Sequence, residues 1–162
     1  LIPDTDGFSW GNDYAYIDLM LEVPADMPIS ISDSSGDMEL SNLTDVSVQD
    51  SSGDIELANM HGELQIQDSS GDIEIEDLDG DLEIISDSSG DVEASDITGS
   101  VTVRVDSSGD LEFTDVAGDV LVERDASGSR SVNDVGGDFT VLRDGSGGIS
   151  SSGVEGEISV PD

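Results

Sequence analysis

The sequence contains no cysteine and no lysine, and its only basic residues are Arg104, Arg124, Arg130 and Arg143. Without cysteine it can form neither a disulfide nor a thiolate metal site. Its 39 acidic residues give a formal net charge of -35, which would repel nucleic acid or an anionic membrane surface. No apolar run approaches the ~20 residues that a membrane-spanning helix needs. We therefore expect no nucleic-acid partner and no membrane span.

One pentapeptide, Asp-Ser-Ser-Gly-Asp, recurs five times, at residues 33–37, 50–54, 68–72, 87–91 and 106–110. Degenerate copies begin at Asp125 and Asp144, so that successive copies start 17 to 19 residues apart. A nearly constant period of about 20 residues is typical of a solenoid, in which each repeat forms one turn.

Apolar residues recur at fixed positions when each repeat is numbered from its first Asp. They occupy positions 6, 8, 11, 15 and 17, with Arg130 at position 6 and Ser151 at position 8 as exceptions. Alternation with polar residues indicates short strands, and no 3.6-residue helical period is present. Glycine at position 4 of every turn and at position 13 of six turns predicts corners with positive φ. The fold expected is all-β: a single-domain parallel β-helix (β-solenoid) of about eight turns, right-handed, with ~19 residues per turn.

The two ends of the chain differ from the regular part. Residues 1–32 are expected to form an N-terminal cap segment and an atypical first turn, with an alternating strand from Tyr14 to Val23. The alternative is a surface arm that docks on a partner. Residues 33–162 then form a seven-turn β-solenoid. The last turn ends in phase with the repeat, so its edge is either blunted or receives another subunit end to end, which would build a filament.

The acidic columns are the strongest candidate for a binding site. Neighbouring carboxylates ~5 Å apart repel by about 3 kcal/mol at an effective dielectric of 20, so bound cations, salt screening or partial protonation would be needed. Calcium fits, because it takes six to eight oxygen ligands. The alternative is that Asp and Ser only form tight turns through their own backbone. The candidate metal ligands are Asp33, Asp37, Asp50, Asp54, Asp68, Asp72, Asp87, Asp91, Asp106 and Asp110. The carboxylates are expected to line the outside of the solenoid, with a Glu column at position 7 on the outer face and a further column of Asn and Asp at position 10.

Catalytic signals are weak. His61 is the only histidine and falls at a corner position, so no Ser-His-Asp set can be assembled. Pairs of carboxylates, as glycosidases use, are explained by the repeat itself. Aromatic residues make up only 4% of the chain, which disfavours a polysaccharide-binding groove. We expect a protein that is not an enzyme, with a polysaccharide-active enzyme as a remote alternative.

The units Ser-Gly-Asp-Ile-Glu-Ile (70–75) and Gly-Asp-Leu-Glu-Ile (80–84), preceded by residues 18–24, resemble a bacterial and archaeal adhesin-type β-strand-repeat family. The resemblance covers roughly residues 14–160. That family is largely of unknown function and occurs on exported or cell-envelope proteins. The resemblance implies an extracellular or cell-surface location, with no catalytic residues to transfer. The absence of lysine and the heavier acid load depart from the family and favour a calcium-rich or saline setting.

Together these features predict a non-enzymatic extracellular structural or adhesive β-solenoid that binds a surface glycan or protein ligand and can assemble end to end. The alternative is a calcium-binding module that folds on export, since metal binding and folding are coupled. No signal peptide is evident at Leu1, so the expected form is a secreted, processed chain.

Overall fold

The computed structural model describes residues 21–24 and 26–161. Most of the predicted cap segment and of the strand predicted from Tyr14 falls on residues 1–20 and lies outside the described residues. Within the described part all regular secondary structure is β. It therefore contains no helix long and apolar enough to cross a membrane.

The described strands form one continuous 14-stranded arrangement in which all pairings are parallel. They are β1 (Ile29–Ser32), β2 (Met38–Ser41), β3 (Thr44–Gln49), β4 (Ile55–Gln67), β5 (Ile73–Asp79), β6 (Leu82–Ser86), β7 (Val92–Ile97), β8 (Val101–Val103), β9 (Leu111–Val116), β10 (Val120–Val122), β11 (Arg130–Val135), β12 (Phe139–Val141), β13 (Ile149–Val154) and β14 (Ile158–Ser159).

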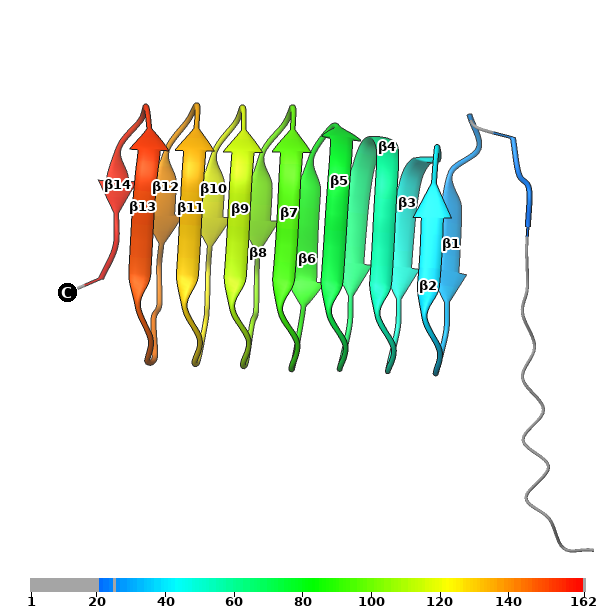
Figure 1. The fold of residues 1–162 in the computed structure, drawn as a ribbon, viewed down its shortest axis with the longest axis horizontal. Helices are drawn as coiled ribbons and strands as arrows, with labels where there is room; N and C mark the ends of the chain where they lie inside the picture. Colours follow the sequence, from blue (N-terminus) through cyan, green and yellow to red (C-terminus); the bar gives the residue numbers. More distant parts are fainter. Residues whose placement is uncertain (1–20, 25, 162) are drawn as a thin grey trace, which may run out of the picture.

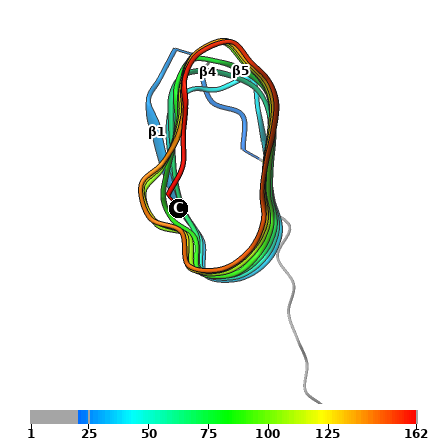
Figure 2. The ribbon, with the colours of Figure 1, turned by 90° about the vertical axis from the view of Figure 1, so that its left-hand side faces the viewer.

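Each repeat contributes one strand to each of two opposite faces. One face carries β2, the first half of β4, β5, β7, β9, β11 and β13, and the other carries the remaining strands together with the second half of β4. Figure 1 shows the strands of the two faces running in opposite directions, and Figure 2 shows the turns superimposed as a flattened oval. The predicted β-solenoid is confirmed, with about seven turns in the described residues.

The five predicted apolar columns form the core. Equivalent residues pair directly between turns, for example Ile55 with Ile73 and Val92 with Leu111. Between Val46 and Val141 the apolar column residues are at most 3% exposed. Exposure rises only at the ends of the stack, where Ile149 and Val154 are half-buried and Ile158 is 48% exposed. Burial of these columns is the main force that holds the turns together.

The corner glycines serve two different purposes. Those at position 4 have φ between 114° and 138°, and from Gly53 onward an added Cβ would lie 1.7–2.0 Å from the carbonyl oxygen of the equivalent glycine one turn earlier. At position 13 φ is positive at Gly62 and Gly80, as predicted, but the expectation is wrong for Gly99, Gly118, Gly137 and Gly156. Those glycines are required because a Cβ there would lie 2.3–2.7 Å from a carbonyl oxygen of the preceding turn.

The left-handed corner lies instead at position 10 of the repeat. There the backbone has φ between 53° and 58° at Asn42, Asn59, Asp77, Asp96, Asp115 and Asp134, and φ of 65° at Gly153. Asn and Asp tolerate this conformation better than other residues with a Cβ because their short polar side chains can hydrogen-bond locally.

Candidate functional site in the acidic columns

The two Asp residues of each Asp-Ser-Ser-Gly-Asp loop face different environments. From Asp50 to Asp125 the first Asp is at most 2% exposed, whereas the fifth residue is exposed in every copy. The prediction that the carboxylates line the outside is therefore wrong for position 1. The ten predicted calcium ligands fall into two separate columns, one that is buried from Asp50 onward and one that is exposed. Among residues 21–24 and 26–161, no group of three or more His, Cys, Asp or Glu side chains is arranged to hold a metal ion.

The first three residues of the loop form a tight turn stacked on the turn before. The Oδ1 atoms of Asp33 and Asp50 each accept a hydrogen bond of 2.7 Å from the N–H of the next serine. The Oγ of Ser70, at position 3, donates to the carbonyl oxygen of Ser51 one turn earlier at 3.1 Å. The same donation recurs at Ser52, Ser89, Ser108 and Ser127. These contacts support the turn-forming interpretation of the motif.

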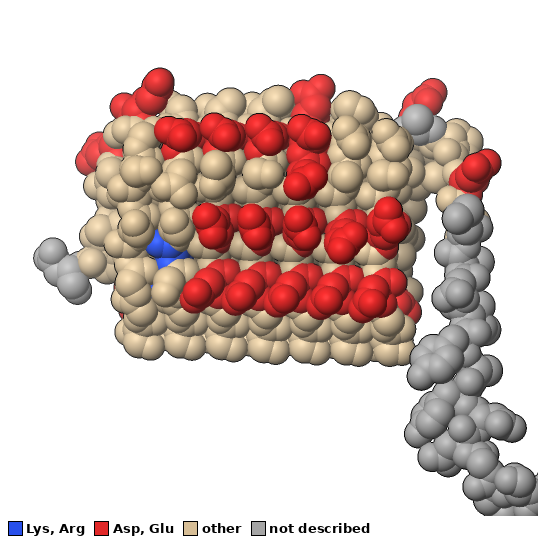
Figure 3. Space-filling view, viewed as in Figure 1, with Lys and Arg blue, Asp and Glu red and all other residues tan. Residues whose placement is uncertain are grey.

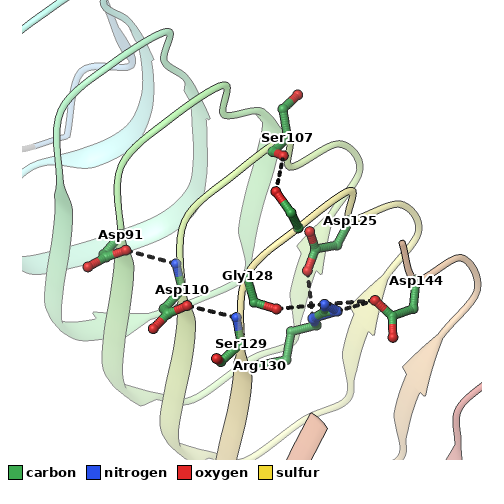
Figure 4. A network of polar contacts seen from close by, with 9 residues as sticks. Asp91, Ser107, Asp110, Asp125, Gly128, Ser129, Arg130 and Asp144 are labelled. Atoms are coloured by element: carbon green, nitrogen blue, oxygen red, sulfur yellow. Dashed lines mark hydrogen bonds and ion pairs between the residues drawn. The ribbon is translucent and has the colours of Figure 1, made fainter. Parts of the chain in front are cut away.

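The fifth residue forms a ladder along the outside of the solenoid. Oδ1 of Asp72 accepts the backbone N–H of Asp91 at 2.9 Å, and Oδ1 of Asp91 accepts that of Asp110 at 2.8 Å. The ladder ends where Oδ1 of Asp110 accepts the N–H of Ser129, as Figure 4 shows. Each carboxylate is thereby fixed in position with one oxygen engaged by backbone.

A second exposed acidic column runs beside this ladder. The position 7 glutamates Glu56 and Glu74 pair in register, as do Glu93 and Glu112. Figure 3 shows rows of acidic residues across the face formed by β2, β4, β5, β7 and β9. We call the following ten residues the acidic face: Asp37, Asp54, Asp72, Asp91, Asp110, Glu39, Glu56, Glu74, Glu93 and Glu112. None of the ion pairs in the described residues involves the acidic face.

The first residues of the loops form a column inside the solenoid. Asp87, Asp106 and Asp125 are 0–2% exposed, and backbone bridges connect Asp87 to Asp106 and Asp106 to Asp125. No hydrogen bond of normal geometry reaches either carboxylate oxygen of Asp106, or Oδ2 of Asp87. Buried carboxyl oxygens without partners are expensive as charges, which favours the neutral form.

The pKa values in the buried column follow from this environment. Burial, and then the charges of Asp125 and Asp87, raise the pKa of Asp106 from 3.8 to about 7. Burial, and then the charge of Asp68, raise the pKa of Asp87 to about 6. Burial also raises the pKa of Asp68. The nearby backbone N–H groups of Ser107 and Ser108 lower the pKa of Asp106 by less than these effects raise it.

Arg130 closes the C-terminal end of this column. It occupies position 6, pairs in register with Leu111 and Ile149, and is 1% exposed. Figure 4 shows its guanidinium between Asp125 and Asp144. Its Nε lies 2.6 Å from Oδ2 of Asp125 as an ion pair, and its Nη2 donates to Oδ1 of Asp144 at 2.7 Å and to the carbonyl oxygen of Gly128 at 2.8 Å. Burial raises the pKa of Asp125, and the Arg130 charge opposes that rise.

The sequence pattern identified Arg130 only as an exception in an apolar column. A signal for its role was present, because an arginine at a core position requires a buried acid within reach, and Asp125 and Asp144 are the position 1 residues nearest in sequence. The same signal indicates that position 1 faces inward.

Comparison with known proteins identifies a domain family. The family model described as Toastrack DUF4097 matches residues 12–161, which is most of the chain. No curated protein and no solved structure gave a significant match.

Proposed function

The chain belongs to the Toastrack DUF4097 family, a domain of unknown function, and from this premise we propose that it is a non-catalytic structural scaffold that adheres to cationic partners outside the cell. The observation that carries the proposal is the acidic face, whose ten carboxylates are all exposed and lie in two rows. A surface of this charge attracts amine-bearing glycans or proteins rich in Lys and Arg, and repels anionic polymers.

The spacing of this face is fixed by backbone and not by flexible side chains alone. Each Asp from Asp54 to Asp110 is fixed by the N–H of the following turn at 2.7–3.0 Å. Neighbouring turns of a parallel sheet lie ~4.8 Å apart, and alternate residues of a strand lie ~6.6 Å apart. The face therefore presents charges in a regular grid, which reduces the ordering entropy that a partner must overcome on binding.

The non-catalytic part of the proposal is supported by the surroundings of the reactive side chains. His61 is exposed, and its Nδ1 lies 3.8 Å from Oδ2 of Asp79. The position 3 serine hydroxyls donate to backbone carbonyls of the preceding turn.

Binding to a polylysine-coated sensor surface tests the proposal, with a polyglutamate surface as reference. The variant Glu56→Gln/Glu74→Gln/Glu93→Gln removes three charges from the acidic face. We expect its affinity for polylysine to fall about tenfold, because three exposed ion pairs of ~0.5 kcal/mol each amount to that factor. Binding should also weaken steeply as salt is added.

The matched control is Asp79→Asn/Glu123→Gln/Glu155→Gln, which removes the same charge from exposed positions outside the acidic face. It should lose less than threefold in affinity. Equal losses in the two variants would show that only total charge matters, and the proposal of a specific face would be wrong.

Calcium binding on the acidic face is a second candidate. It is favoured by the free side of the position 5 ladder, where the hydrogen bonds of Asp72 and Asp91 use Oδ1. Two neighbouring carboxylates and water would supply the oxygen ligands that calcium prefers. Thermal melting with calcium and with a chelator tests this: the midpoint should rise with calcium in the native chain and not in the Asp72→Asn/Asp91→Asn variant.

End-to-end self-association is a third candidate and is favoured by the last turn. There β13 pairs with β11 and β14 pairs with β12, each on one side only within the described residues. Ile158 and Val160 are 48% and 41% exposed beside these edges. A second copy would cover them by continuing the parallel ladder. Light scattering over a concentration series should show growth, and Ile158→Lys should abolish it. A mass that stays monomeric at every concentration would contradict the candidate.

A further inference from the structure

The interior of the solenoid contains a row of carboxyl groups that the acidic face does not explain. Asp50, Asp68, Asp87, Asp106 and Asp125 are each at most 2% exposed and stack one above another in successive turns. The chain supplies one buried cation to this row, Arg130, which among the acidic residues described here pairs with Asp125 and, beyond it, Asp144. The carboxyl groups from Asp50 to Asp106 require another source of positive charge.

The buried row offers too few oxygen ligands to bind a metal ion. Between two turns the row offers carboxylate oxygens from two residues, whereas calcium takes six to eight oxygen ligands. The main-chain carbonyls of the row are already engaged, because the N–H of Ser107 donates to the carbonyl oxygen of Asp87 and that of Ala126 to the carbonyl oxygen of Asp106, both at 3.1 Å. A proton shared between two turns needs only one carboxyl oxygen from each turn.

We propose that the buried Asp row is a proton-binding site, in which neighbouring carboxyl groups share protons taken up from solvent on folding, and that Arg130 replaces the proton at the C-terminal end. Each step adds one proton to one carboxylate and forms one neutral carboxylic acid, which then donates to a carboxyl oxygen of the adjacent turn. The unpartnered oxygens of Asp68, Asp87 and Asp106 supply the acceptors.

The charged groups around the row support this assignment. Burial is the largest cause that raises the pKa of Asp68, Asp87, Asp106 and Asp125. Charges of neighbouring row members raise the pKa of Asp68, Asp87 and Asp106 further, Asp54 and Asp72 of the exposed ladder add to the rise at Asp68 and Asp87, and Arg130 opposes the rise at Asp125. Position 6 of the preceding turns is apolar, with Ile73, Val92 and Leu111 at 1% exposure, so no side chain there competes for the protons. The pKa of Asp106 reaches about 7 under these influences, which places its titration near neutral pH.

The consequence is a solenoid that is more stable in mild acid and loosens as the row loses its protons. This differs from relief of repulsion on the outer surface in two respects. The repulsion between exposed carboxylates is screened by salt. Burial raises the pKa of Asp68, Asp87, Asp106 and Asp125, and it shields these groups from salt.

The test combines infrared spectroscopy and thermal melting on the full chain. With ¹³C-labelled aspartate, the carbonyl band of protonated carboxyl groups should be present at about pH 6 in the folded protein and absent on unfolding at the same pH. The variant Asp106→Asn mimics the protonated acid in shape. It should lower the intensity of that band. In high salt, it should also reduce the decrease in melting midpoint that the native chain shows as pH rises from about 5 to about 8. The matched control, Asp110→Asn, removes one exposed carboxylate four residues away and should change neither.

Three results would overturn the proposal: no protonated carboxyl band in the folded native chain at about pH 6, an equal effect of the two variants on the pH slope, or a rise in melting midpoint on adding calcium that Asp106→Asn removes and Asp110→Asn keeps. The last result would assign the row to a metal instead. None of these results depends on whether the acidic face binds a partner.

Discussion

Arg130 and Leu111 occupy the same core position in consecutive turns and pair directly in register, although one carries a charge and the other does not. Both are 1% exposed. The difference between the turns lies in the acids beside them: Arg130 meets Asp125 and Asp144, whereas the Asp106 carboxyl has no such cation. One solenoid therefore uses two ways to neutralise the same buried row, a guanidinium at one end and, by our proposal, protons along the rest.

Replacing Arg130 with leucine should be strongly destabilising at neutral pH. Arg130→Leu restores the apolar column but leaves Asp125 and Asp144 without their cation, and removing one partner of a buried ion pair costs about 3–5 kcal/mol. Urea unfolding at about pH 7.5 measures the loss. At about pH 5 the loss should shrink, since Asp125 can then be neutralised by a proton.

The control for this variant is Arg104→Leu, which breaks an exposed ion pair between Arg104 and Glu83. Exposed pairs contribute about 0–1 kcal/mol, so this variant should unfold close to the native midpoint. If Arg130→Leu were no more harmful than Arg104→Leu, the guanidinium would not be the counter-charge of the row.

The free energy of unfolding should fall as pH rises from about 4 to about 7. Asp87 and Asp106 have pKa values raised from 3.8 to about 6 and about 7, so over this window the folded chain binds more protons than the unfolded chain. The slope of stability with pH is then negative, and it flattens above the folded pKa values. Treated independently the two groups would account for ~3 and ~4 kcal/mol, and less together because each raises the other's pKa.

Calorimetry in buffers of different ionisation enthalpy measures the protons released on unfolding. At about pH 6, in high salt that screens the outer carboxylates, unfolding should release protons in the native chain. Stability that stayed constant between about pH 5 and pH 7.5 under these conditions would contradict the raised pKa values.

The repeat made the fold predictable from sequence, while the direction of individual side chains was harder to predict. Alternation within each turn gave the strands and the apolar columns, because period two is imposed by the pleat. At position 1 alternation could not be applied, since the residue lies in a corner where the backbone is not a strand. An Asp that recurs at this position in every turn is equally compatible with a turn former, a surface ligand or a buried group.

Position 10 is a second place where the sequence did not show why its residue type is required. Its run of Asn and Asp resembled one more acidic ladder, yet these residues are chosen for φ near 55°. Gly153 at the equivalent place in the last turn is the residue that reveals the backbone requirement, because glycine shares with Asn and Asp only the ability to adopt that conformation.

The position 4 glycines should tolerate no side chain. In Gly90→Ala the new Cβ would lie 1.8 Å from the carbonyl oxygen of Gly71, and φ is 138°. Overpacking and backbone strain together should cost about 3–5 kcal/mol. Gly148→Ala is the control, because no atom lies within 4 Å of its added Cβ. Chemical unfolding of both variants should separate them by several kcal/mol, and similar midpoints would show that the turns can move apart freely.

The left-handed backbone at Asp96 predicts which residue types can replace it, independently of the charge that is lost. Asp96 has φ of 57°, a conformation that a β-branched residue adopts only with strain, so Asp96→Val should lose about 1–2 kcal/mol. Asp96→Gly removes the same carboxylate without strain and should stay within ~0.5 kcal/mol of the native chain. Glu93→Val, in the same strand but at an exposed extended position, serves as the control for adding valine and should be neutral. Urea unfolding of the three variants should show that only Asp96→Val is destabilised. A loss of the same size in Asp96→Gly would show that Asp96 acts through its carboxylate and not through its backbone conformation.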